Sequence, residues 1–144
     1  MPALLPGSWA MIGIDTNILV RLVVNDDERQ ARAVERFILH QAMSRARCYV
    51  SNMALIETVW VLETVYGYDR AQVADAMEAI LEVEQLEFDS PIDAKAAVDD
   101  FRRGPTEFVD CLIGRMNLFV GCDYTVTFDR KAAKLPGFQL LKSG

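Results

Sequence analysis

Histidine and cysteine are scarce in this sequence, and their scarcity narrows the chemistry that the protein could perform. His40 is the single histidine among 144 residues, and it lies within an apolar helical pattern. A mechanism based on histidine therefore has little support. The three cysteines, Cys48, Cys111 and Cys122, form neither a CxxC pair nor a cluster with the histidine. Their odd number and wide spacing predict reduced, structural thiols in the cytoplasm.

An excess of positive charge is also missing. The net charge is −6 and the isoelectric point about 4.7. That is the wrong sign for a protein that holds nucleic acid by its overall charge. Binding of a phosphate-containing partner would need a local source of positive charge. Metal ions bound to carboxylates could provide it, because a bound divalent cation is often the largest charge in a site.

Segments that would direct the chain to a membrane are lacking as well. The longest apolar stretch, around residues 53–66, contains Glu57 and Glu63 and is too short to cross a bilayer. Residues 1–10 have no positively charged start, and prolines and a glycine interrupt their apolar run, so they make a poor secretory signal. We expect a soluble cytoplasmic protein with no membrane partner, in which residues 1–10 form an N-terminal extension to a single domain over residues 11–144.

What the sequence does contain is an alternation of strand and helix patterns without a linker or repeat. Hydrophobic residues make up 51% of the chain, enough for a full core and for some apolar surface that a partner would cover. Expected strands end at residue 15 and span residues 48–50, 86–88, 124–128 and 138–141, and expected helices span residues 16–24, 28–46, 51–66, 70–83, 91–103, 106–120 and 130–135. This order predicts an α/β fold, a three-layer sandwich with a mainly parallel central sheet flanked by helices.

Four acidic residues occupy positions where apolar or turn residues would be the ordinary choice. Asp15 and Asp129 each follow an expected strand, and the carboxyl ends of parallel strands face the ligand crevice of an open sheet. Glu57 and Asp110 lie within apolar helices. Each position has a simpler interpretation, since Asp15 could only cap the next helix and Glu57 could form a salt bridge or reach water. All four acids could also converge at one edge of the sheet.

Convergence would have a chemical consequence. Two carboxylates about 4 Å apart repel by roughly 4 kcal/mol at an effective dielectric constant of about 20. The cluster must therefore be protonated, relieved by basic neighbours or occupied by cations. Oxygen ligands without cysteine or histidine suit Mg²⁺ or Mn²⁺ and not zinc. Such ions activate water and stabilise a leaving oxygen, so hydrolysis of phosphodiesters is the natural reaction.

The order of these motifs resembles the PIN domain family, and specifically its ribonuclease toxins of the VapC type. The resemblance covers about residues 11–141 and rests on Ile14-Asp15-Thr16-Asn17, on Glu57 in an apolar helix, on Phe108-Val109-Asp110 and on Thr127-Phe128-Asp129. It implies that Asp15, Glu57, Asp110 and Asp129 form a catalytic metal site, with Asp129 acting directly or through water, and that Thr16, Asn17 and Thr127 support it. It also implies a single-stranded RNA substrate, a homodimer, and a cognate antitoxin whose basic side chain enters the acidic site.

Two other interpretations remain open from the sequence. The first is a Mg²⁺-binding, receiver-like signalling domain, but that class would want an acidic pair after the first strand, where this chain offers only Asp15. The second is a PIN-like binding module without catalysis. Independently of function, the apolar helix from Met53 to Tyr66 and its neighbour from Arg70 carry more hydrophobic surface than one sheet face can cover, which predicts a dimer through these helices.

Overall fold

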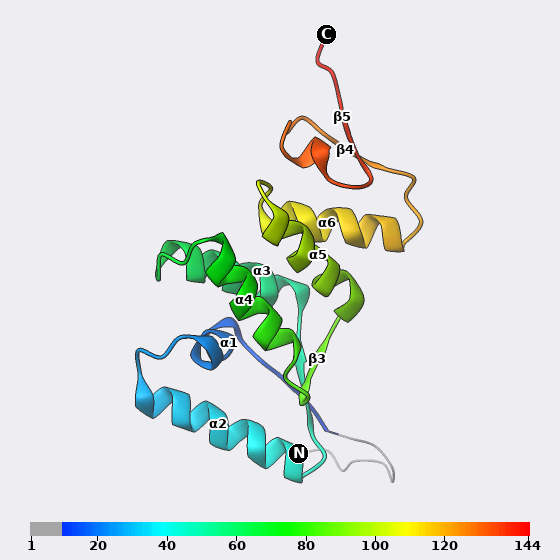
Figure 1. The fold of residues 1–144 in the computed structure, drawn as a ribbon. Coiled ribbons are helices and arrows are strands. Elements are labelled where there is room, and N and C mark those ends of the chain that lie inside the picture. The colour runs from blue at the N-terminus through cyan, green and yellow to red at the C-terminus, as the bar shows by residue number, and fades with distance from the viewer. Residues whose placement is uncertain (1–9) are drawn as a thin grey trace.

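The computed structural model describes residues 10–144, so most of the expected N-terminal extension, residues 1–9, lies outside the described part. Helices and strands alternate along the chain (Figure 1). Their bounds are β1 Met11–Gly13, α1 Thr16–Val23, α2 Glu28–Met43, β2 Arg47–Val50, α3 Asn52–Thr64, α4 Arg70–Leu81, β3 Leu86–Phe88, α5 Pro91–Arg103, α6 Phe108–Phe119, β4 Thr125–Thr127, the 3₁₀ helix η1 Ala132–Lys134 and β5 Phe138–Leu140. The predicted α/β class is confirmed, and most element ends fall within two or three residues of the expected ones.

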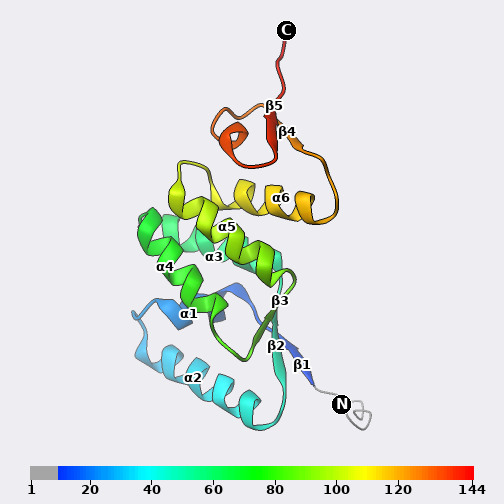
Figure 2. The same ribbon diagram turned by 45° about the vertical axis from the view of Figure 1, so that its right-hand side comes forward.

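All strand pairs within residues 10–144 are parallel, as predicted, but the strands divide between two sheets. One sheet has the order β1-β2-β3, and the other pairs β4 with β5 alone. Figures 1 and 2 both show α5 and α6 between the two sheets. The sequence predicts one central sheet, so the position of β4 is a difference that matters for the site.

Close packing against α6 holds the β4–β5 pair where it is. Gly114 of α6 lies against the ring of Phe138, and a Cβ atom at this glycine would come within 2.2 Å of that ring. The side-chain amide of Asn117 donates a hydrogen bond to the hydroxyl of Thr125 at 2.9 Å. These contacts fix β4 beside α6, away from the edge of β1.

Local sequence signals determine where several helices begin. The carboxylate of Asp15 accepts a hydrogen bond from the backbone N–H of Thr16 and caps α1, and the hydroxyl of Ser51 caps α3. Asp69 and Gln72 form a capping box at the start of α4. α5 begins with proline at its first position, where the missing N–H costs no helical hydrogen bond. Apolar side chains on the inner faces of these helices pack into one core. Its members include Leu19, Leu55, Leu62, Val73, Ile80 and Phe101.

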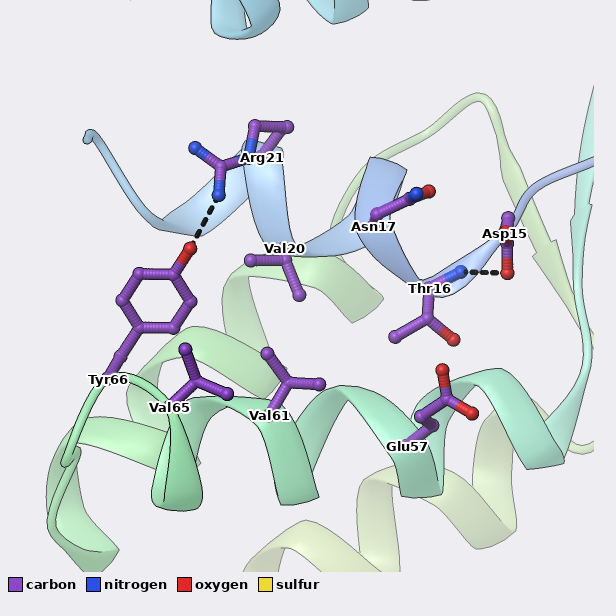
Figure 3. Close-up of a pocket in the computed structure, with 9 residues that line it drawn as sticks. All are labelled: Asp15, Thr16, Asn17, Val20, Arg21, Glu57, Val61, Val65 and Tyr66. Carbon is purple, nitrogen blue, oxygen red and sulfur yellow. Dashed lines mark hydrogen bonds between the residues drawn. The ribbon is translucent and has the colours of Figure 1, made fainter. Parts of the chain in front are cut away.

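The core contains two of the three cysteines, Cys48 and Cys111, as expected of structural thiols, whereas Cys122 is exposed; all three are free thiols. α1 lies alongside α3 and runs in the same direction, so the start of α1 faces Glu57 and its end faces Tyr66, just after α3 (Figure 3). Among residues 10–144, no helix combines the length and the apolar character that a bilayer crossing requires.

Candidate functional site

A groove runs between α1 and α3 and brings together residues that are far apart in the sequence. It encloses about 210 Å³. The residues that line this α1–α3 groove are Asp15, Thr16, Asn17, Val20, Arg21, Glu57, Val61, Val65 and Tyr66 (Figure 3). Two of the four predicted acids therefore share one cavity.

Asp15 and Glu57 form the acidic end of the groove. Figure 3 shows the Glu57 carboxylate directed from α3 towards the start of α1, where Thr16 and Asp15 lie. Both acids are exposed, and among residues 10–144 neither forms an ion pair with a lysine or arginine. Oδ1 of Asp15 accepts the N–H of Thr16 at 2.7 Å, so this residue does cap the helix. Within the described residues its second carboxylate oxygen accepts no hydrogen bond, and capping therefore leaves a ligand atom for an ion.

Asp110 and Asp129 form a second acidic pair. Asp110 is half-buried in the first turn of α6, and its pKa is raised above the usual value by burial and then by the charges of Asp129 and Glu107. Asp129 follows β4, and its backbone N–H donates to the hydroxyl of Thr127 at 3.0 Å. Thr127 thus supports the turn that carries this acid.

The expectation that all four acids share a single cluster is wrong for this structure. Within residues 10–144, no three acidic, histidine or cysteine side chains lie close enough together to hold one metal ion. The reason is the pairing of β4. Because β4 pairs with β5 and packs on α6, Asp129 lies near Asp110 and not beside Asp15 at the end of β1.

The end of the groove away from the acids contains residues that the sequence analysis did not single out. The guanidinium of Arg21 donates to the hydroxyl of Tyr66 at 2.6 Å and also pairs with Asp26. A sequence signal for Arg21 exists, because it lies four residues after Asn17 and therefore on the same face of α1. Tyr66 gave no such signal, since only the packing of α1 alongside α3 brings it here.

The acidic end has the chemistry of a magnesium site. Its donors are carboxylate, amide and hydroxyl oxygens from Asp15, Glu57, Asn17 and Thr16, and no cysteine or histidine lines this groove in the described chain. Mg²⁺ in proteins is commonly held by one or two carboxylates, with water and phosphate oxygens completing its shell. The two carboxylates here match that pattern.

Comparisons with known proteins found similarity over most of the chain. A family model described as "PIN domain" matches residues 12–137, a range that contains all four acids. The chain is also 25% identical over 126 residues to a protein named VapC ribonuclease from Aquifex aeolicus (strain VF5), and the alignment covers 88% of this chain and 92% of that relative.

Proposed function

Because the chain belongs to the PIN domain family, we propose that it is a metal-dependent endoribonuclease that cleaves the phosphodiester bonds of single-stranded RNA. The observation that carries this proposal is the pairing of Asp15 and Glu57 in one groove, both exposed. The relative's printed name, VapC ribonuclease, supports the same activity. The PIN domain match also argues against the receiver-like signalling domain, which would need an acidic pair after the first strand where this chain has only Asp15.

Nucleases with PIN domains generally use divalent metal ions, and we propose Mg²⁺ or Mn²⁺ for this one. The proposed ligands are Asp15 and Glu57 as one pair and Asp110 and Asp129 as a second pair. When bound, such an ion would polarise the scissile phosphate and activate a water molecule. The carboxylates themselves orient that ion, and Thr16, Asn17 and Thr127 support them. The ion also offsets the negative charge that would otherwise repel RNA from this end of the groove.

The biological role that we propose is the toxin of a toxin–antitoxin pair in the cytoplasm. The similarity to a VapC protein supports it. The cognate antitoxin would place a basic side chain between Asp15 and Glu57, where it would compete with the metal ion for the same carboxylates. The free thiols of Cys48 and Cys111 suit a reducing compartment.

Incubation with a mixed pool of single-stranded RNA tests the proposed activity. We expect cleavage in Mg²⁺ and loss of cleavage after addition of EDTA, because the carboxylates alone cannot supply the activated water. Sequencing the products locates the cleavage positions. RNA that stays intact in Mg²⁺ and in Mn²⁺, with a protein shown to be folded, would instead support the binding-module alternative.

We further propose that the protein is a homodimer formed through α3. The outer face of this helix exposes Met53 at 80% and Trp60 at 59% of their surfaces. A shallow groove of about 420 Å³ lies along the same face. In α4, by contrast, Val73 and Ile80 are fully buried, so that helix adds little free apolar surface. The described structure therefore supports α3 as the centre of the interface.

We expect Trp60→Lys to convert the dimer into a monomer, because the new charge would have to be desolvated at the interface. Sedimentation velocity at high micromolar concentration measures the change. Leu39→Lys is the matched control, since Leu39 is an equally exposed apolar residue on α2 at 64% exposure. A wild-type protein that sediments as a monomer at this concentration would rule out the dimer.

A further inference from the structure

The α1–α3 groove has two chemically different ends, and the proposed reaction uses only one of them. Arg21 lies at the other end, six residues along α1 from Asp15 (Figure 3). At a helical rise of 1.5 Å per residue, this places the two residues about 9 Å apart along the helix axis. Arg21 is the single cationic residue that lines the groove within residues 10–144.

The wall between the two ends is apolar. Val20 of α1 and Val61 and Val65 near the end of α3 line the middle of the groove. The groove therefore presents an acidic end, an apolar wall and a cationic end in that order. A single strand of RNA has a matching order, with a phosphate, then a sugar and base, then the next phosphate.

The Arg21 side chain is held in place but retains hydrogen-bonding capacity. Only 12% of its side-chain surface is exposed. Nη2 donates to the Tyr66 hydroxyl and Nη1 to the Asp26 carboxylate. A guanidinium has five N–H donors. In the described part of the chain these two bonds use two of them, and the other three have no protein acceptor there.

Asp26 neutralises the charge of the Arg21 guanidinium less than a buried carboxylate would. The Asp26 side chain is 49% exposed, so water screens much of its charge. Both bonds also restrict the rotamers of a long side chain. Arginine with a fixed orientation is well suited to a phosphate, because its planar fork can form two parallel hydrogen bonds to phosphate oxygens.

We propose that Arg21 is a substrate-binding residue that contacts the RNA phosphate next to the one being cleaved, and that Tyr66 and Asp26 are positioning residues for its guanidinium. This inference rests on the proposed ribonuclease function. It defines a minimum substrate, because the contact requires a second phosphate beyond the scissile one. A dinucleotide has one phosphodiester and lacks the second, whereas a trinucleotide has two.

The first test compares unphosphorylated dinucleotide and trinucleotide substrates. We expect the wild-type enzyme to cleave the trinucleotide with a kcat/KM about 10- to 100-fold higher, mainly through KM, as the loss of one hydrogen-bonded charge pair predicts. Arg21→Gln should remove this preference. Tyr66→Phe should weaken it, because the guanidinium keeps its charge but loses one of its two supports.

The second test does not require cleavage. Binding of a labelled single-stranded RNA octamer in Mg²⁺ is measured at several salt concentrations by fluorescence anisotropy. We expect Arg21→Gln to weaken binding and to lower the salt slope by about one, the value for one lost phosphate contact. Arg32→Gln is the matched control, since Arg32 is also paired with an acid, Glu28, but lies on the exposed face of α2.

The outcomes separate the inference from the proposed function. RNA that no variant cleaves, together with a reduced salt slope for Arg21→Gln, would reject the ribonuclease and keep the phosphate contact. A lower melting temperature for Arg21→Gln with an unchanged salt slope and unchanged substrate preference would overturn the inference, because Arg21 would then only join α1 to the end of α3. If Arg21→Gln does not fold, an unaltered KM in Tyr66→Phe overturns it instead.

Discussion

Asp15→Asn and Asp110→Asn are expected to abolish metal-dependent RNA cleavage without lowering the melting temperature of the metal-free protein. Each change removes a charged ligand from one of the two proposed pairs, Asp15 from the pair with Glu57 and Asp110 from the pair with Asp129. Without that ligand, the activated water is lost. The rate should fall by orders of magnitude, because each 1.36 kcal/mol of lost transition-state stabilisation lowers it about tenfold.

The expected stability of Asp110→Asn follows from the sign of its pKa shift. Burial, Asp129 and Glu107 raise the pKa of the Asp110 carboxyl in the folded protein. A raised pKa means that the folded state binds the proton more tightly than the unfolded state. The ionised carboxylate is thus destabilising above its folded pKa, and this penalty disappears as the pH falls through that value. Asparagine removes the charge, so the variant should be more stable at neutral pH and its advantage should shrink in acid.

Asp15→Asn should leave stability nearly unchanged for a different reason. The residue is exposed and caps α1 through Thr16. Asparagine caps helices about as well as aspartate.

Thermal unfolding in EDTA and cleavage in Mg²⁺ measure stability and activity separately. Asp123→Asn, an exposed acid in the turn after α6, is the control for loss of one charge. Cleavage that persists while the melting temperature falls would show that Asp15 and Asp110 serve the fold and no chemistry.

Asp100→Asn is expected to have the opposite effect and to destabilise the protein by about 3 kcal/mol. The Asp100 side chain is 3% exposed and joins α5 to α6 through Arg115. Its two oxygens accept bonds from Nε of Arg115 at 2.7 Å and from Nη2 at 2.8 Å, and Arg103 adds a third bond at 2.6 Å. The same contact raises the pKa of Arg115. Asparagine would leave these guanidinium groups without their counter-charge.

Thermal unfolding tests whether Asp100→Asn destabilises the protein while Asp110→Asn does not. A loss of about 3 kcal/mol should lower the melting temperature by about 10 °C in a domain of this size. Asp99→Asn, at the adjacent position of α5, should change it little. A neutral Asp100→Asn combined with a destabilising Asp110→Asn would reverse the roles that we assign to the two acids.

Much of the fold follows from signals that lie within a few residues of each other. The cap at Ser51 and the box formed by Asp69 and Gln72 mark helix starts that the structure confirms. The partner of β4 was not predictable in this way. The β-branched pattern at Thr125–Thr127 predicts a strand, but its neighbour depends on whether the pair packs on α6, and the contact between Gly114 and Phe138 decides that.

The same division applies to the site. Asp15 and Glu57 were identifiable because each breaks a local pattern, one at a strand end and one in an apolar helix. Tyr66 was missed because it is 45 residues from Arg21, and the two meet only when α1 and α3 pack side by side. Asp100 was missed because its sequence neighbours resemble a solvated helix face, and burial by α6 is a property of the folded chain.

The central claim, that the acidic end of the groove holds the ion that cleaves RNA, is tested most directly by the RNA assay across a range of Mg²⁺ concentrations. Wild type is compared with Glu57→Gln and with Glu63→Gln, a change on the same helix but outside the groove. We predict saturable Mg²⁺-dependent cleavage for wild type and Glu63→Gln, and for Glu57→Gln either no cleavage or a much higher Mg²⁺ requirement. Identical Mg²⁺ dependence for Glu57→Gln and wild type would contradict the account.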